Sequence, residues 1–237
     1  MPPDVAVVLP TYNEAENLPA VAGAIRQHGY RLIVVDDNSP DGTGRIADEL
    51  AAGDDGITVV HRPSKQGLGP AYADGFAAAL GGSADVICQM DADFSHEPAG
   101  LPTLVEAVRG GADVAIGSRY VPGGSVPGWP LHRRLLSLWG NRYARTLLRT
   151  TIQDMTSGFR AYRSAVLRTL DPATCEASGY GFQVEMSRRC HEQGLSVVEM
   201  PITFRDRERG ESKMHWRIAL EAMWLVTVWG VRARMGR

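Results

Sequence analysis

Short apolar runs that alternate with helical patterns dominate the first half of this chain. The strand-like runs cover residues 5–9, 32–36, 57–61, 86–90 and 114–117. Helical patterns fall between them, at residues 17–28, 43–51, 70–80 and 101–109. Strands joined by helices form right-handed crossovers. This order therefore predicts an α/β fold in which helices flank a mainly parallel sheet.

The composition is that of a globular protein with one locally basic segment. The chain has 237 residues, 44% of them hydrophobic and 22% charged, and a net charge of -2, which argues against a nucleic-acid partner. Residues 114–153 nevertheless contain no acidic residue and hold Arg119, Arg133, Arg134, Arg142, Arg145 and Arg149. This distribution predicts a local anionic partner.

The cysteines and the two ends of the chain indicate the cellular compartment in which the protein works. Cys88, Cys175 and Cys190 are odd in number and lack paired spacing, which disfavours disulfides and a structural zinc and fits a reducing cytosol. Residues 1–4 have no basic region and do not resemble a signal peptide. The most apolar C-terminal stretch, residues 218–231, is shorter than the roughly 20 residues that a membrane-spanning helix needs.

Two carboxylates directly follow one of the predicted strands. Asp91 and Asp93, separated by Ala92, lie where a parallel strand would deliver them to the ligand-binding edge of the sheet. Such a pair can share a hard divalent cation that keeps open positions for phosphate oxygens. An isolated Asp-x-Asp is more often a solvated turn or a helix cap. The neighbouring motifs decide between these interpretations.

Six further motifs flank this pair in a fixed order: residues 7–18 (VVLPTYNEAENL), 34–43 (VVDDNSPDGT), 117–120 (GSRY), 154–160 (DMTSGFR), 179–185 (GYGFQVE) and 204–213 (FRDRERGESK). An ordered set is far more specific than any single motif. Together they resemble the inverting glycosyltransferases of the GT-A fold, and among these the dolichol-phosphate and polyprenol-phosphate mannose synthases. The resemblance spans about residues 5–215. It implies transfer of mannose from GDP-mannose to a polyprenyl (dolichyl-type) phosphate with inversion.

The same resemblance implies a donor site and a metal. The donor-binding residues would be Pro10, Tyr12, Glu14, Val35, Asp37, Asp91, Ala92, Asp93, Arg119, Arg207 and Lys213. Asp91 and Asp93 would bind Mg²⁺ or Mn²⁺, with Ser95 as a weaker ligand where related synthases often carry Gln. Asp93 and Arg119 would be the catalytic residues. His96 is interpreted as a surface histidine, because imidazole suits softer metals.

Some of these residues also have local structural interpretations. Asn13 has the position of a helix cap, and Glu16 three residues later completes a capping-box-like pattern. Arg207 and Lys213 would ordinarily be read as part of a solvated run of alternating charges. The resemblance favours donor binding for both.

The acceptor half follows a loop rich in Pro and Gly at residues 122–130. We expect one GT-A domain over residues 1–216, with a nucleotide half at about 1–120 and an acceptor half at about 121–216. Residues 131–148 have helical periodicity, and their apolar stripe comprises Leu131, Leu135, Leu138, Trp139 and Leu147.

The resemblance implies that the acceptor phosphate is held by Arg119, Arg133 or Arg134, and Ser137. A phosphate monoester is already anionic at neutral pH and attacks without a general base. Asp154 and Glu185 keep a base-catalysed alternative open.

Residues 217–237 form the last segment, predicted to be an amphipathic helix. Tryptophans and arginines around a short apolar stretch suit the interface of an anionic membrane, and ordinary packing against the domain is the alternative. We expect a cytoplasmic enzyme, peripheral at the cytoplasmic face of a membrane, with a membrane-protein partner. Two other functions remain open: transfer from UDP-glucose or another UDP-hexose to the same lipid, and an inactive nucleotide-sugar-binding or membrane-recruitment module.

Overall fold

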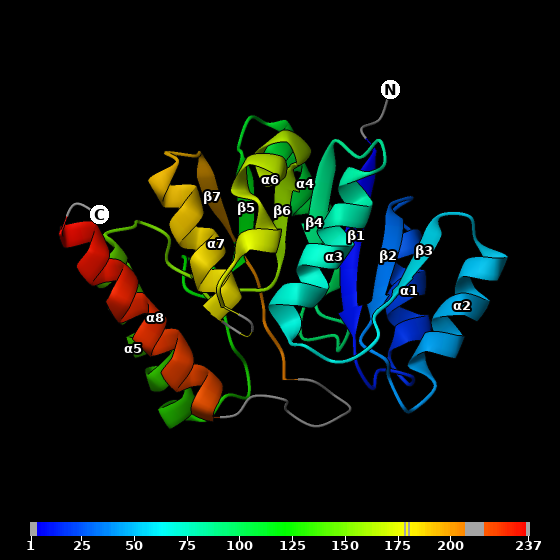
Figure 1. The fold of residues 1–237 in the computed structure, drawn as a ribbon, viewed down its shortest axis with the longest axis horizontal. Helices are drawn as coiled ribbons and strands as arrows, with labels where there is room; N and C mark the ends of the chain where they lie inside the picture. The colour runs from blue at the N-terminus through cyan, green and yellow to red at the C-terminus, as the bar shows by residue number, and fades with distance from the viewer. Residues whose placement is uncertain (1–3, 178, 180, 207–215, 236–237) are drawn as a thin grey trace.

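A seven-stranded sheet with helices on both faces organises the molecule (Figure 1). The computed structural model describes residues 4–177, 179, 181–206 and 216–235. The strands are β1 (Val5–Thr11), β2 (Arg31–Asp36), β3 (Ile57–His61), β4 (Val86–Gln89), β5 (Val114–Ser118), β6 (Arg160–Arg163) and β7 (Val197–Pro201). Their order across the sheet is β3-β2-β1-β4-β6-β5-β7.

The helices divide into two layers that enclose the sheet. One face packs against α1 (Leu18–Arg26), α2 (Thr43–Gly53) and α4 (Leu101–Arg109). The other packs against α3 (Leu68–Leu80), α5 (Leu131–Leu148), α6 (Ser164–Leu170), α7 (Gly181–Glu192) and α8 (Trp216–Arg234). Short 3₁₀ turns occupy Pro98–Gly100 and Pro172–Thr174.

Strand β1 explains why the sheet sits between two layers. Its side chains alternate in direction, so Val7 and Leu9 enter the core beneath α1 while Ala6 and Val8 enter the core beneath α3. All four are at most 1% exposed. A strand buried on both faces needs apolar residues at every position, which is the pattern of residues 5–9.

The sheet is parallel except at β6. This strand runs antiparallel to both β4 and β5, with Ala161 opposite Cys88 on one side and Ala115 on the other. The prediction of a mainly parallel sheet is thus confirmed. The sequence pattern predicts no strand at 160–163, because four residues that begin and end with arginine lack an apolar run.

The predicted cap at Asn13 is wrong. Helix α1 begins at Leu18, and Asn13 has a left-handed backbone with φ 55°. The reason is a long-range contact: the backbone N–H of Glu14 donates to Thr43 Oγ1 at 2.9 Å, and that of Ala15 donates to Asp41 Oδ2 at 3.1 Å. Asp41 in the loop before α2 and Thr43 at the start of that helix therefore bind residues 14 and 15, which lie outside α1.

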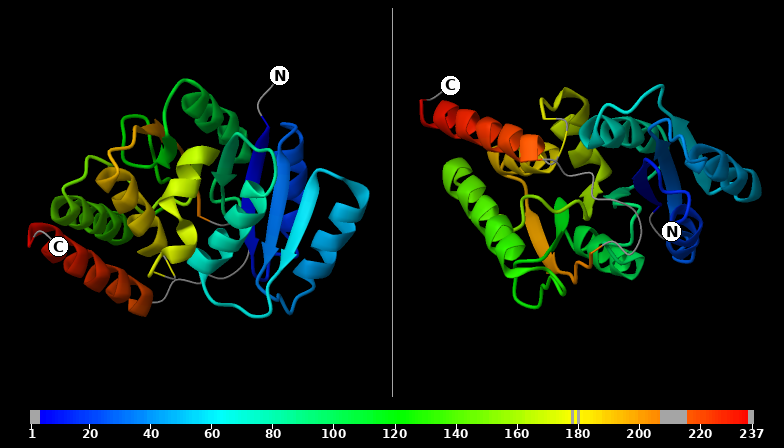
Figure 2. Two further views of the ribbon diagram at one scale, coloured as in Figure 1. Left: turned by 45° about the horizontal axis from the view of Figure 1, so that its top comes forward. Right: turned by 90° about the horizontal axis from the view of Figure 1, so that it is seen from below.

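Helices α5 and α8 lie side by side at one end of the sheet (Figures 1 and 2). Residues 131–148 are helical as predicted, but most of the apolar stripe does not enter the core. Leu131, Leu135, Leu138 and Trp139 are 69%, 55%, 37% and 50% exposed, and only Leu147 packs against the core.

Helix α8 packs against the domain on one side and is exposed on another. Val226 and Trp229 are buried against the domain, whereas Trp224 and Val231 are 69% and 45% exposed. The Tyr143 and Thr227 hydroxyls are 2.7 Å apart and join α5 to α8. Across the described residues, no helix has both the length and the apolar character needed to cross a bilayer.

Candidate active site

The carboxyl ends of the parallel strands bring the predicted residues to one edge of the sheet. Tyr12 follows β1, Asp37 follows β2, and Asp91 and Asp93 follow β4. Arg119 follows β5, which lies parallel to β7 and two positions from β4. This is the edge at which open α/β sheets bind ligands.

The turn after β4 orients both carboxylates. The Tyr72 hydroxyl of α3 donates to Asp91 Oδ1 at 3.0 Å, and the backbone N–H of Ser95 donates to Asp93 Oδ1 at 3.0 Å. The Asp91 side chain is 30% exposed and Asp93 is 6% exposed. Gly158 lies beside Asp91, so a side chain at this position would crowd the carboxylate at about 3.3 Å.

The carboxylates of Asp91 and Asp93 fit a hard divalent cation. Both ligands are carboxylate oxygens, which Mg²⁺ and Mn²⁺ prefer. Within the described residues, no cluster of three or more His, Cys, Asp or Glu side chains could hold a metal. Two protein carboxylates leave coordination positions for phosphate oxygens and water, while Ser95, 3% exposed, could add only a hydroxyl.

The interpretation of His96 as a surface residue is wrong. Its side chain is 2% exposed, and its ring stacks on Phe159 at 5.2 Å and meets Phe204 edge-on at 5.1 Å. Burial lowers the pKa of His96 to about 4, so the ring is neutral at pH 7. Its Nδ1 lies 3.9 Å from Asp91 Oδ2. His96 thus forms part of the aromatic wall behind the carboxylate pair.

Arg119 is bound by a carboxylate that sequence reasoning considered as a base. Its Nε donates to Asp154 Oδ2 at 2.7 Å and its Nη2 to Asp154 Oδ1 at 2.6 Å. Burial opposes ionisation of Asp154, but the charge and hydrogen bonds of Arg119 hold its pKa below the ordinary value. A carboxylate this fully engaged is a poor proton acceptor.

Glu185 is also used structurally. Its side chain is 1% exposed, and Oε2 accepts the backbone N–H groups of Glu176 at 2.9 Å and Ala177 at 3.1 Å. Oε1 accepts from Arg189 at 2.7 Å. These contacts attach α7 to the segment that precedes it, so Glu185, like Asp154, is engaged by hydrogen bonds within the protein.

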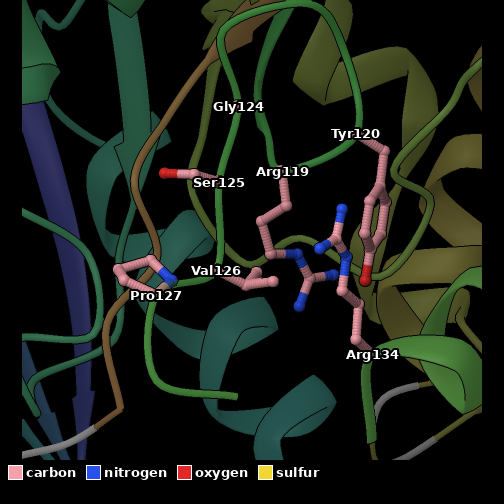
Figure 3. Close-up of a pocket in the computed structure, with 7 residues that line it drawn as sticks. All are labelled: Arg119, Tyr120, Gly124, Ser125, Val126, Pro127 and Arg134. Carbon is pink, nitrogen blue, oxygen red and sulfur yellow. The ribbon is translucent and has the colours of Figure 1, made fainter. Parts of the chain in front are cut away.

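A cavity of about 260 Å³ opens beside Arg119 (Figure 3). Arg119, Tyr120 and Arg134 line it together with the loop residues Gly124, Ser125, Val126 and Pro127. Figure 3 shows the side chains of Arg119, which follows β5, and Arg134 of α5 directed into the same space. Two guanidinium groups in one cavity have the chemistry to bind a phosphate.

The structure gives different surroundings to Arg133 and Arg134, between which the sequence did not decide. Arg133 donates to Asp206 Oδ1 at 2.7 Å and lies over the Trp129 ring at 4.1 Å. Arg134, by contrast, lines the cavity with Arg119. Ser137 accepts the Tyr120 hydroxyl at 2.6 Å, which fixes the ring at the cavity wall.

Two cations that sequence reasoning missed lie beside Tyr12 and Asp37. Lys65 Nζ lies 3.8 Å from the centre of the Tyr12 ring. Arg62 pairs with Asp37 and, through Nε at 2.7 Å, with Asp74. Burial raises the pKa of Asp37 even though Arg62 opposes the shift. Both residues follow β3, so their position after a predicted strand is the sequence signal that could have identified them.

Two predicted donor contacts are buried inside the protein. Val35 is 0% exposed within the core, and its carbonyl accepts the Thr11 hydroxyl at 3.3 Å. Ala92 is 4% exposed and packs in the opposite core cluster. Their side chains support the strand ends and do not line an open site. Arg207 and Lys213 lie outside the described residues.

The family model described as Glycosyl transferase family 2 matches residues 6–171. The chain belongs to glycosyltransferase family 2. The family assignment agrees with the strand-end carboxylates and with the predicted GT-A fold.

Two relatives of this family 2 chain are similar over nearly its whole length. It is 50% identical over 234 residues to a polyprenol monophosphomannose synthase of Mycolicibacterium smegmatis, covering 98% of this chain and 88% of that protein. It is 49% identical over 232 residues to an undecaprenyl-phosphate mannosyltransferase of Micrococcus luteus, covering 97% and 95%.

The fold is shared with a solved mannosyltransferase, PcManGT from Pyrobaculum calidifontis in complex with GDP-Man and Mn²⁺. The TM-score is 0.63 at 16% identity, and the match covers 97% of this chain and 64% of that one. The GT-A fold expected from the sequence is confirmed.

Proposed function

We propose that this enzyme transfers mannose from GDP-mannose to polyprenyl phosphate with inversion, producing polyprenyl phosphate mannose and GDP. The observation that carries the proposal is 50% identity over 98% of the chain to a polyprenol monophosphomannose synthase. The geometry supports it, because strand-end carboxylates lie at the same sheet edge as a cavity lined by two arginines.

The donor would bind across the ends of β1, β2 and β4. Tyr12, Glu14 and Asp37 would contact the nucleoside, with Arg62 and Lys65 holding Asp37 and the Tyr12 ring in position. Pro10, Arg207 and Lys213 complete the proposed donor set.

Asp91 and Asp93 would hold Mg²⁺ or Mn²⁺, with Ser95 adjacent. The ion supplies Lewis-acid neutralisation of the charge that grows on the departing diphosphate. The residues contribute a fixed orientation, since Tyr72 and the Ser95 backbone each bind one carboxylate. Metal choice between Mg²⁺ and Mn²⁺ is decided by assay.

The acceptor phosphate would bind between Arg134 and Arg119, beside Tyr120 and Ser137. Because a phosphate monoester is already ionised, its oxygen attacks the anomeric carbon without losing a proton to the protein. The engagement of Asp154 by Arg119 and of Glu185 by backbone N–H groups supports a mechanism that uses no general base.

The protein would work at the cytoplasmic face of a membrane. Exposed apolar side chains on α5 and α8, including Leu131, Trp139 and Trp224, support contact with lipid. A membrane-protein partner could use the same surface.

A panel of radiolabelled donors tests the function. GDP-mannose, UDP-glucose and UDP-N-acetylglucosamine are each incubated with short-chain polyprenyl phosphate in detergent and Mg²⁺ or Mn²⁺. We expect label to enter the organic phase only from GDP-mannose, with inversion of the anomeric configuration by NMR. Transfer from UDP-glucose would establish the UDP-hexose alternative instead. Tight donor binding without turnover would indicate an inactive binding module.

A further inference from the structure

A second and larger cavity lies along α5. Its volume is about 570 Å³, against about 260 Å³ for the cavity beside Arg119, and Tyr120 lines both. Leu138, Arg142 and Arg145 of α5 and Gln153 of the following loop form most of its wall. The acceptor, which carries a single phosphate, is already accommodated beside Arg119 and Arg134, so this cavity has no role in the proposed reaction.

The cavity is cationic. Arg142 and Arg145 line it, and no carboxylate does so among the described residues. Arg145 Nη1 donates to Gln153, while its Nε is buried without a hydrogen-bond partner in the described structure. Two carboxylates close to Gln153 have other partners: Asp154 binds Arg119, and Glu199 accepts the backbone N–H groups of Gln153 at 2.7 Å and Asp154 at 2.9 Å. The two guanidinium groups in the wall therefore have no ion-pair partner among the described residues.

The surface beside the cavity is apolar. Leu131, Leu135 and Trp139 recur at four-residue spacing on α5 and are 69%, 55% and 50% exposed. Leu138, 37% exposed, belongs both to this surface and to the cavity wall. Around the cavity, α5 thus places exposed apolar side chains next to the guanidinium groups of Arg142 and Arg145. This combination of apolar and cationic side chains suits a ligand with an anionic headgroup and a hydrocarbon tail.

We propose that this cavity binds the phosphate headgroup of an anionic membrane phospholipid, with its acyl chains over Leu131, Leu135 and Trp139. The inference rests on the proposed function only in assuming that the enzyme works at a lipid membrane. Arginine is suited to the headgroup because its planar fork makes paired hydrogen bonds to phosphate oxygens. The adjoining apolar surface distinguishes a lipid from free phosphate.

A short-chain lipid tests the site without a membrane. Dihexanoyl-phosphatidylglycerol is titrated below its micelle concentration and followed by calorimetry. We expect saturable one-to-one binding that is at least about tenfold tighter than that of dihexanoyl-phosphatidylcholine, inorganic phosphate or glycerophosphate. Arg142→Gln/Arg145→Gln should abolish it. Arg142→Lys/Arg145→Lys, which keeps the charge but loses the fork, should weaken it several-fold.

Vesicle flotation provides the second measurement. About 1 kcal/mol per basic residue near an anionic surface corresponds to a roughly 30-fold loss for two residues. We expect this loss for Arg142→Gln/Arg145→Gln on vesicles containing phosphatidylglycerol, and little change on neutral vesicles. Arg45→Gln/Arg168→Gln removes the same two charges from α2 and α6 and should bind as the wild type does. Circular dichroism and thermal melting confirm that each variant is folded.

Three outcomes would overturn the proposal. Equal lipid binding by wild type and Arg142→Gln/Arg145→Gln would exclude the cavity as the headgroup site. Phosphate binding as tightly as the lipid would indicate a free-anion site. Competitive displacement of the lipid by short-chain polyprenyl phosphate would assign the cavity to the acceptor. The donor panel with wild-type protein in detergent contains no phospholipid, so failure of the proposed function is detected separately.

Discussion

Arg119 and Asp154 form a forked ion pair that joins the end of β5 to the loop before β6. The two contacts measure 2.7 and 2.6 Å, and the side chains are 8% and 0% exposed. The backbone N–H of Arg119 adds a third bond to Asp154 Oδ2 at 2.9 Å. Because Arg119 also lines the smaller cavity, this pair fixes one wall of the proposed acceptor site.

We expect Asp154→Asn to lower the free energy of unfolding by about 3–5 kcal/mol, because it leaves a buried guanidinium without its charge partner. The pKa of Asp154 is lowered in the folded protein. Its ionised form therefore stabilises the protein fully above the ordinary Asp pKa of about 4, and this contribution is lost as the pH falls through the folded-state pKa.

Urea denaturation at several pH values measures this difference. The gap between wild type and Asp154→Asn should be constant near neutrality and should shrink in acid. Asp48→Asn serves as the control, since Asp48 is 59% exposed on α2. A gap below 1 kcal/mol at pH 7 would contradict the assigned role of the pair.

The buried ring of His96 makes stability sensitive to mild acid. Its folded-state pKa of about 4 lies below the ordinary value of 6.5, so the unfolded chain takes up the proton first as the pH falls. Stability is then lost between about pH 6.5 and 4, with a loss on the order of 2 kcal/mol at pH 5.

His96→Phe should keep the contacts with Phe159 and Phe204 and flatten this acid slope. Denaturant unfolding at pH 7 and pH 5 compares the two proteins. The exposed His28 provides the control, because His28→Gln should retain the wild-type slope. An unchanged slope in His96→Phe would mean that other groups govern the acid response.

We expect Asp93→Ala to abolish transfer, since removing a metal-binding carboxylate forfeits several kcal/mol of charge neutralisation in the transition state. Ser95→Ala should cost far less, because water can replace a hydroxyl and the backbone N–H that binds Asp93 is retained. Initial rates with Mg²⁺ and Mn²⁺ and with EDTA measure both. Full activity of Asp93→Ala in EDTA would disprove the metal site, and equal losses would show Ser95 to be a ligand.

Two tryptophans on opposite sides of α8 separate packing from membrane contact. Trp229, 4% exposed, packs in the core, so Trp229→Ala should cost about 3–5 kcal/mol of stability. Trp224, 69% exposed, should be replaceable by Ala with little loss of stability and a clear loss of binding to anionic liposomes.

Chemical denaturation measures the stability of Trp229→Ala and Trp224→Ala, and liposome flotation measures their membrane binding. Deletion of residues 217–237 would not separate the two effects, because it would also remove Val226 and Trp229 from the core. Normal liposome binding by Trp224→Ala would assign this face to a protein partner.

The sequence by itself determined the architecture and the position of the carboxylates. Both depend on local periodicity: alternating apolar runs specify strands buried on two faces, and Asp91 and Asp93 must leave such a strand at its carboxyl end. The ordered motifs added the family. None of this required knowing which distant residues touch.

Only the tertiary structure decided the environments of these residues. The pairing of Arg119 with Asp154, the burial of His96 and the hydroxyl of Tyr72 on Asp91 join segments that local patterns treat separately. The choice of Arg134 over Arg133 as a cavity residue and the exposure of Leu131 likewise depend on what packs against α5. Periodicity states which side chains share a face, but long-range packing decides whether that face meets core, cavity or solvent.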